Sequence, residues 1–211
     1  MITKENLIKE LTDPGEFAPR PPQKEKIMQE DKLILLGNGP SKSQCPFTDG
    51  VDIWAAVSVL SDPKYADKRY DKVFCFDDPT LKANENEGLE IAKKRHLTIV
   101  GYGRFLSCVT EDYPLGVLQR TFKTNYFLND LSYMIALAVH KEYKALFLYG
   151  VDQSGPIESA GKDIDGNPHD YRNGRAYVAF WLGVAAGRGI TYKVSSLGEP
   201  WFRSSRVGGY E

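Results

Sequence analysis

An apolar segment early in the chain leads directly into small and polar residues that could bind a phosphate. Residues 33–36 are branched aliphatic, and residues 37–41 then read Gly-Asn-Gly-Pro-Ser. The apolar run is typical of a strand buried on both faces of a parallel sheet. Gly37 and Gly39 permit close approaches that a β-carbon prevents, so main-chain N–H groups could converge on an anion. This segment yields four candidate phosphate-binding residues: Gly37, Asn38, Gly39 and Ser41.

Two common phosphate-binding motifs do not fit this segment. No Gly-Lys-Ser or Gly-Lys-Thr follows it, as a P-loop requires. Lys42 also stands where a dinucleotide-binding motif has its third glycine. A glycine turn that merely ends a strand is therefore the alternative interpretation.

Two carboxylates, Asp77 and Asp78, follow a second apolar segment at residues 72–76. A carboxylate at the end of a strand can bind a ribose hydroxyl, hold Mg²⁺ or contact a reacting hydroxyl. It can equally cap the next turn, because Asp is frequent before a proline such as Pro79. We treat both aspartates as candidate catalytic residues and as candidate magnesium ligands.

Further candidate ligand contacts fall at the expected ends of helices and strands. Asn129 and Asp130 precede an apolar run and are suitable N-cap residues, and a helix N-terminus also attracts phosphate. Asp152 comes two residues after the apolar segment 145–150. Arg175 falls in the first turn of an expected helix, where a cation opposes the helix dipole. Its partner could be a phosphate or a nearby aspartate.

His169 is the candidate acid or base. It lies in the segment 154–172, which contains three glycines and a mixture of charges. A long loop beside a ligand site commonly acts as a lid. An imidazole titrates near neutral pH, which suits proton transfer. A surface histidine without a chemical role is the alternative.

The overall composition argues against several functions. The chain has 211 residues and a net charge of −1, which does not indicate binding to nucleic acid or to an anionic membrane. No apolar run is long enough to span a bilayer, and the N-terminus does not resemble a signal peptide. The three cysteines are widely spaced, as reduced thiols are, and form no zinc motif. We therefore expect a cytoplasmic protein without a membrane partner.

Strand and helix patterns alternate along most of the chain. Residues 1–30 are expected to form a short helix and a proline-rich lead-in, and residues 31–211 a single domain. This alternation predicts an α/β fold with a parallel sheet and helices on both faces. The expected strands are 32–37, 52–57, 72–76, 97–100, 145–150 and 190–194. The expected helices are 62–69, 80–95, 129–143 and 173–187.

The carboxyl ends of parallel strands meet at one edge of a sheet, where α/β proteins bind ligands. Three polar segments leave strands at that edge, at residues 38–43, 77–78 and 152–154. Their convergence predicts a ligand site more strongly than any single motif does.

Most of residues 32–195 resembles one superfamily. The resemblance is carried by Leu-Gly-Asn-Gly-Pro-Ser at 36–41, the strand ending near Asp77, Asn129-Asp130 before Tyr-Met-Ile-Ala-Leu-Ala, and Leu-Tyr-Gly-Val-Asp at 148–152. The superfamily includes the small bacterial Rossmann-like sialyltransferases, the motility-accessory-factor glycosyltransferases, archaeal 6-hydroxymethyl-dihydropterin pyrophosphokinases and short phage-encoded proteins. The resemblance implies a Rossmann-like fold, with a mostly parallel sheet of about six strands between helices.

The resemblance also implies roles for individual residues. The loop 37–41 would hold the phosphate of a nucleotide. Asn129 and Asp130 would stand where the sialyltransferases carry a Thr-Ser pair that contacts the donor. Asp152 would end the strand behind the substrate.

The chain departs from the family's pattern at three places. Ser58, or the residue before it, replaces an asparagine at the end of the second strand. Asp77 or Asp78 replaces an asparagine after the third strand, as in the pyrophosphokinase branch, where carboxylates hold magnesium. The histidine base of the sialyltransferases aligns with Asn173, whereas His169 fits a neighbouring position.

These observations leave three hypotheses for function. The first is a glycosyltransferase that uses a nucleotide sugar, with the donor phosphate at the loop 37–41. The second is a magnesium-dependent pyrophosphokinase or related phosphotransferase, with Asp77, Asp78 and Asp152 binding the metal. The third is a non-catalytic nucleotide-binding protein of a phage-infected bacterial cell. Each binds a nucleotide-type small molecule, magnesium is a cofactor only in the second, and a homo-oligomer is compatible with all.

Overall fold

The computed structural model describes residues 31–77, 83–104, 106–152, 157–162, 168–169 and 174–195. The segments 157–162 and 168–169 are described by their backbone. The expected helix and proline-rich lead-in at residues 1–30 lie outside the described residues, so the proposed division of the chain remains a prediction.

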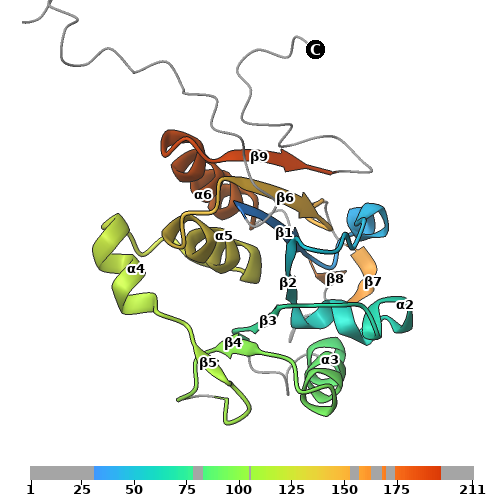
Figure 1. Cartoon of the computed structure of the whole chain (residues 1–211). Coiled ribbons are helices and arrows are strands. Elements are labelled where there is room, and N and C mark those ends of the chain that lie inside the picture. The colour runs from blue at the N-terminus through green and yellow to red at the C-terminus, as the bar shows by residue number, and fades with distance from the viewer. Residues whose placement is uncertain are drawn as a thin grey trace, which may run out of the picture.

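The central sheet has seven strands, and all of its pairings are parallel (Figure 1). In spatial order the strands are β5 (Glu111–Asp112), β4 (Ile99–Gly101), β3 (Lys72–Cys75), β2 (Asp52–Ala56), β1 (Lys32–Leu36), β6 (Ala145–Tyr149) and β9 (Thr191–Val194). The expected Rossmann-like α/β arrangement is confirmed. The sheet has one strand more than the six expected, because β5 is only two acidic residues long and carries no apolar pattern.

Helices cover both faces of the sheet, as expected (Figure 1). Successive side chains of a strand point to opposite faces. Leu33 and Leu35 of β1 therefore pack into one core, and Ile34 and Leu36 into the other. The first core is completed by α4 (Leu115–Phe122), α5 (Asp130–His140) and α6 (Arg175–Gly187). The second is completed by η3 (Val57–Ser61), α2 (Pro63–Ala66) and α3 (Ala83–Lys94).

Two helices differ from the expected pattern. The expected helix 62–69 is the four-residue α2, which follows directly on the 3₁₀ turn η3. Asp62 caps α2 by accepting a hydrogen bond from the Lys64 N–H. The helix α4 was not expected, because it is short and buries only Leu118 fully within the core.

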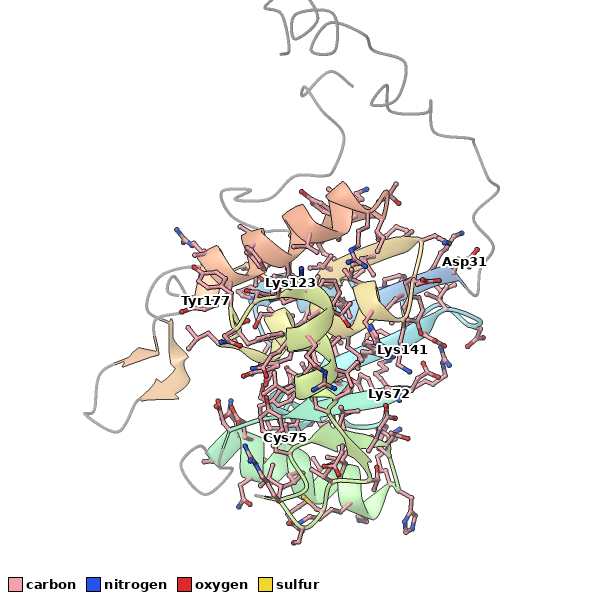
Figure 2. All side chains as sticks on the ribbon, turned by 90° about the vertical axis from the view of Figure 1, so that its left-hand side faces the viewer. Asp31, Lys72, Cys75, Lys123, Lys141 and Tyr177 are labelled. Carbon is pink, nitrogen blue, oxygen red and sulfur yellow. The ribbon has the colours of Figure 1, made fainter. Side chains whose placement is uncertain are left out.

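The expected lid contains β-structure in its described part. β7 (Ile157–Lys162) pairs antiparallel with β8 (Pro168–His169) in a two-stranded sheet that is separate from the main one (Figure 2). This part of residues 154–172 is therefore a β-hairpin rather than a loop without secondary structure. Its sequence, with Gly161 and a mixture of polar residues, gave no alternating apolar pattern that would indicate a strand.

Strand order reverses between β1 and β6. From β1 the chain adds β2, β3, β4 and β5 on one side, whereas β6 and β9 lie on the other side. In open α/β sheets, ligands bind beyond the carboxyl ends of the strands near such a reversal. The loops that follow β1 and β6 therefore define the edge at which a site is expected.

Candidate functional site

The loop after β1 is bonded to the loop after β6. The Gly37 N–H donates to the Tyr149 carbonyl at 2.8 Å, and the Gly39 N–H donates to the Gly150 carbonyl at 2.9 Å. These bonds continue the pairing of the two strands beyond their last residues. The carboxyl edge at the reversal point is thus a rigid, cross-linked unit.

A buried serine and a buried aspartate complete this link. Both the backbone N–H and the hydroxyl of Ser41 donate to Asp152 Oδ2, each at 2.8 Å. The Ser41 hydroxyl accepts a further bond from the Gly150 N–H at 2.8 Å. Ser41 is fully buried and Asp152 is 8% exposed. A carboxylate this deeply buried requires hydrogen-bond donors, and Ser41 supplies two of them.

The glycines of the loop are needed for close packing within the chain itself. A Cβ at Gly37 would lie 2.5 Å from the Gly150 carbonyl oxygen, and a Cβ at Gly39 would lie 2.4 Å from Asp152 Oδ2. Gly150 has a φ of +66°, which L-residues rarely adopt. The close approach expected at Gly37 and Gly39 is present, but the atoms that fill the space belong to the loop after β6.

Most main-chain donors of the loop already have acceptors within the chain. The N–H groups of Gly37 and Gly39 bind carbonyl oxygens of residues 149–150, and that of Ser41 binds Asp152. The Lys42 N–H donates to the Gly39 carbonyl at 3.1 Å. These N–H groups could bind a phosphate only if their bonds within the chain were broken. This favours side chains, rather than the backbone, as the groups that bind a ligand.

Asn38 offers such a side chain. It is half-buried, and its Oδ1 accepts a hydrogen bond from Lys42 Nζ at 2.8 Å. Lys42 Nζ also pairs with Asp62 Oδ2 at 3.1 Å and lies 5.0 Å from the centre of the Tyr65 ring. Asp62 and Tyr65 follow β2, so Lys42 connects the carboxyl ends of β1 and β2.

Ser58 lies in η3, directly beyond β2, and is 8% exposed. The helix α3 packs tightly on this turn, because a Cβ at Gly88 would lie 2.1 Å from the Val57 carbonyl oxygen. Glu85, in the first turn of α3, is 6% exposed. Sequence reasoning missed Glu85, although its spacing from the buried Leu89 and Ala92 places it on the inner face of the helix.

Three carboxylates lie near the end of β3. Burial raises the pKa of the Cys75 thiol, and the negative charges of Asp130, Glu85 and Asp77 raise it further. Asp77 itself is exposed, and Asp78 lies outside the described residues. The candidate site therefore includes acidic groups from β3, α3 and α5.

Asp77 and Asp152 lie at the ends of strands that are not neighbours. Two strands separate β3 from β6 in the sheet. Three strand spacings correspond to about 14 Å, which is too far for both carboxylates to bind one magnesium ion. Among the described residues, no group of three or more His, Cys, Asp or Glu side chains is placed to hold a metal ion.

Asn129 is the N-cap of α5. Its Oδ1 accepts the Ser132 N–H at 2.9 Å, and Ser132 Oγ accepts the Asn129 N–H at 3.3 Å, which forms a capping box. The helix begins at Asp130, whose charge acts on Cys75 at the end of β3. The N-terminus of α5 therefore lies at the carboxyl edge of the sheet, as expected.

The remaining candidates belong to the hairpin and to the start of α6. Arg175 is half-buried at the first residue of α6. His169 is described only as backbone in β8, and Asn173 lies outside the described residues. The proposed roles of His169 and Arg175 remain predictions.

Aromatic residues follow three successive strands at the same edge. Phe76 follows β3, Tyr102 follows β4 and Tyr113 follows β5, and all three contact Tyr133 in the first turn of α5. Phe76 and Tyr133 stack with ring centres 4.1 Å apart. The Tyr113 hydroxyl donates to the Tyr133 carbonyl at 2.8 Å. Sequence reasoning missed this cluster, although an aromatic residue directly after each strand was a usable signal.

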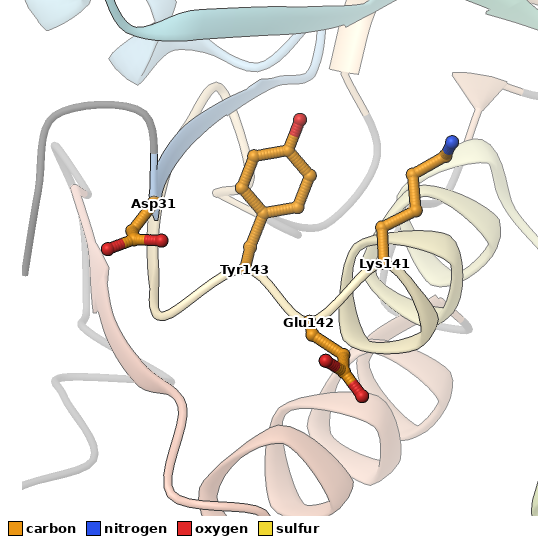
Figure 3. A pocket seen from close by; sticks show the side chains of 4 residues that line it. All are labelled: Asp31, Lys141, Glu142 and Tyr143. Atoms are coloured by element: carbon orange, nitrogen blue, oxygen red, sulfur yellow. The ribbon is translucent and has the colours of Figure 1, made fainter.

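Two hollows in the described part of the chain lie at the opposite, amino edge of the sheet. One, of about 370 Å³, is lined by Asp31, Lys141, Glu142 and Tyr143 (Figure 3). The other, of about 320 Å³, shares Glu142 and Tyr143 and extends to residues 188–190. The Tyr143 hydroxyl donates to the carboxylate of Asp52 at the start of β2. None of the candidate ligand-binding residues lines either hollow.

The chain matches no protein-family model and no curated protein. Several solved structures are similar in fold. The MAf glycosyltransferase from Magnetospirillum magneticum AMB-1 aligns with a TM-score of 0.53 at 12% identity, over 82% of this chain and 32% of that one. The α-2,3-sialyltransferase from Campylobacter jejuni aligns with a TM-score of 0.50 at 16% identity, over 84% and 79%. The α-2,3/8-sialyltransferase CstII gives 0.50 at 16%, over 79% and 81%.

These matches show a Rossmann-like α/β fold shared with glycosyltransferases, which is the fold that the resemblance in sequence implied. The chain spans about a third of the length of the MAf glycosyltransferase. None of the helices in the described part of the chain has the length and apolarity needed to cross a bilayer.

Proposed function

We propose that the protein is a transferase that takes its donor from a nucleotide sugar. The observation that carries this proposal is the cross-linked pair of loops after β1 and β6, at the reversal point of a fold that is similar to sialyltransferases. Polar side chains from four further elements gather at the same edge, and such convergence is typical of nucleotide sites in open α/β sheets.

In this proposal the loops form the floor of the site and side chains bind the donor. Asn38, Ser58 and Asn129 contact the nucleotide, and Asp77 or Asp78 accepts a hydrogen bond from its ribose. The Ser41–Asp152 link fixes the two loops to each other. The side chains that bind the donor therefore stay in place without reorganisation during the reaction.

The proposed reaction is a direct displacement. The acceptor hydroxyl oxygen forms a bond to the anomeric carbon of the sugar, and the bond from that carbon to the phosphate oxygen breaks. The nucleotide leaves with the electron pair. The acceptor proton passes to His169, the proposed general base.

A second candidate is nucleotide binding without transfer. It is favoured by the resemblance, which aligns Asn173 with the histidine base of the sialyltransferases. A magnesium site that joins Asp77 to Asp152 is not favoured, because these residues follow strands about 14 Å apart, whereas a site at Asp77 and Asp78 remains a prediction.

Isothermal titration calorimetry distinguishes these functions. The full chain is titrated with ATP, with CMP, UMP, AMP and GMP and with their common nucleotide sugars, each with and without magnesium. Metal-independent binding of one nucleotide sugar, followed by its slow hydrolysis, is the result that we expect. Tight binding without turnover supports the second candidate. Binding of ATP only with magnesium, or no binding of any nucleotide, overturns the proposal.

A further inference from the structure

Lys42 lies at the centre of the polar groups between the ends of β1 and β2. It belongs to the single 3₁₀ turn η2 (Pro40–Gln44) that follows the glycine loop. Its ammonium group donates to Asn38 Oδ1 at 2.8 Å, pairs with Asp62 Oδ2 at 3.1 Å and lies over the Tyr65 ring. The side chain is 16% exposed, so the ammonium group is held in place but is not sealed from solvent.

The ion pair with Asp62 gives little reason to keep a lysine here for stability. The Asp62 side chain is 37% exposed. Burial raises the pKa of its carboxyl, but the hydrogen bonds from Lys42 and from the Lys64 N–H, together with the charges of both lysines, outweigh this effect and lower the pKa. Because the carboxylate of this pair is in contact with solvent, we expect the pair to contribute only about 1 kcal/mol or less to folding.

A phosphate at this edge needs hydrogen-bond donors that are not already used within the chain. Four N–H groups of the loop, those of residues 37, 39, 41 and 42, are bonded within the chain. Lys42 supplies a full positive charge beside Asn38, which the proposed function assigns to the nucleotide. A lysine ammonium group binds phosphate strongly as a point charge.

We propose that Lys42 binds the phosphate of the nucleotide, and that Asp62 is the counter-ion that it leaves when the phosphate enters. This inference rests on the proposed function, because it assumes that a nucleotide is the ligand. In this proposal the Lys42 side chain, which follows the glycines, binds the phosphate in place of the main-chain N–H groups. The glycines allow the loop to pack against Asp152.

The two halves of this proposal predict effects of opposite sign. Lys42→Met removes the charge and should weaken the binding of a nucleotide. Asp62→Asn removes the competing carboxylate and should strengthen it. Asparagine keeps a side-chain oxygen that can accept the Lys64 N–H and cap α2, so this variant tests charge without removing the cap.

The chain offers a matched control in Lys64. Its ammonium group lies 5.8 Å from the centre of the same Tyr65 ring, but it makes no contact with Asn38 among the described residues. Lys64→Met therefore removes an equal charge from the same region, including its electrostatic effect on Asp62, but leaves the contact of Lys42 with Asn38 in place.

The experiment is calorimetric titration of wild type and the three variants with CMP, UMP, AMP and GMP, with the matching nucleosides, and with pyrophosphate. We expect Lys42→Met to weaken the binding of the nucleotide by about 10-fold to 100-fold while leaving the nucleoside unchanged. Asp62→Asn should tighten nucleotide binding severalfold, and Lys64→Met should leave it unchanged.

Failure of this inference and failure of the proposed function give different results. If wild type binds a nucleotide and Lys42→Met binds it equally well, Lys42 does not bind the phosphate and the proposed function stands. If wild type binds pyrophosphate in a Lys42-dependent manner but binds no nucleotide, the phosphate site is right and the nucleotide is wrong. If Lys64→Met weakens binding as much as Lys42→Met, the effect is one of overall charge and the inference is overturned.

Discussion

Ser41 and Asp152 are 111 residues apart in sequence, and the serine donates two hydrogen bonds to a single carboxylate oxygen of the aspartate. This pair fastens the end of β1 to the end of β6, where the order of the strands reverses. It makes the two loops one structural unit. Each residue was expected to contact a ligand, and the structure gives each of them a structural role as well.

Removal of the Ser41 hydroxyl should destabilise the protein. Ser41→Ala leaves the buried Gly150 N–H without its acceptor and takes one donor from Asp152. We expect the free energy of unfolding in urea to fall by about 1–3 kcal/mol. Ser43→Ala is the control, because Ser43 lies in the same turn but is exposed, and it should change stability by less than about 0.5 kcal/mol. Equal effects of the two variants would show that the buried link is not formed.

Replacement by alanine should change the folding stability in opposite directions at Gly39 and at Gly183. At Gly39 a Cβ would lie 2.4 Å from Asp152 Oδ2, so Gly39→Ala should cost about 1–3 kcal/mol of folding free energy. At Gly183, on the outer side of α6, a Cβ meets nothing within 4 Å in the described part of the chain. Gly183→Ala should therefore stabilise the protein by about 0.5–1 kcal/mol, because alanine is the better helix former.

Urea unfolding of both glycine variants, followed by circular dichroism, checks this prediction. The sign of the difference is the test, since both substitutions add one methyl group. A stabilised Gly39→Ala variant would mean that the loop after β1 does not pack against Asp152.

The sheet was predictable because its strands carry strong local signals. The apolar runs of β1, β2 and β3 are buried on both faces, and that of β6 is buried on one face and partly buried on the other. The strands β5, β7 and β8 were missed because two of them have only two residues and the third is polar. Their positions depend on pairing with other parts of the chain, which local periodicity does not encode.

The edge that carries the site was predictable, but its contacts were not. Polar residues after strands indicate the carboxyl edge, and Asn129 at the N-cap of α5 follows from its residue type. The partner of Ser41 depends on which strand lies beside β1, and that is a property of the whole sheet. For the same reason the sequence did not reveal that Asp152 Oδ2 lies beside Gly39.

Substitutions of Asn129 should separate its structural role from its proposed role in binding. Asn129→Ala removes the acceptor of the Ser132 N–H and should cost about 1 kcal/mol of folding free energy. Asn129→Ser keeps a capping oxygen and should leave the unfolding midpoint in urea almost unchanged. If the amide of Asn129 contacts the nucleotide, Asn129→Ser still weakens the nucleotide binding measured by calorimetry, whereas unchanged affinity in that variant limits Asn129 to the cap.

Replacement of His169 should slow the proposed transfer. General-base contributions are about 10²-fold to 10⁴-fold, so His169→Ala should reduce hydrolysis of the bound nucleotide sugar by about 10²-fold or more. The affinity for the nucleotide should change little. His140→Ala is the control, because His140 ends α5 at the opposite edge of the sheet and should have no effect on hydrolysis. Full activity in His169→Ala would remove this residue from the mechanism.

Four buried or half-buried tyrosines should make the protein sensitive to alkali. Burial raises the pKa of Tyr70, Tyr102, Tyr113 and Tyr143 above the ordinary value of 10.0. The folded state therefore holds these phenol protons more strongly than the unfolded state does. Stability should be independent of these groups below pH about 10 and should fall as the pH rises above that value, by up to about 1.4 kcal/mol per pH unit for each tyrosine.

Tyr143→Phe tests this origin of the alkaline sensitivity. Burial has the largest effect in raising the pKa of Tyr143. The hydrogen bond to Asp52 and the negative charges of Asp52 and Asp71 raise this pKa further. The variant loses the bond to Asp52, so we expect lower stability at pH 7 but a shallower decline between pH 9 and pH 11 in urea unfolding. Tyr126→Phe is the control, because Tyr126 is 38% exposed, and its decline should match that of wild type. If Tyr143→Phe declines as steeply as wild type, the alkaline loss of stability arises from other groups, and the half-buried phenol of Tyr143 contributes nothing to it.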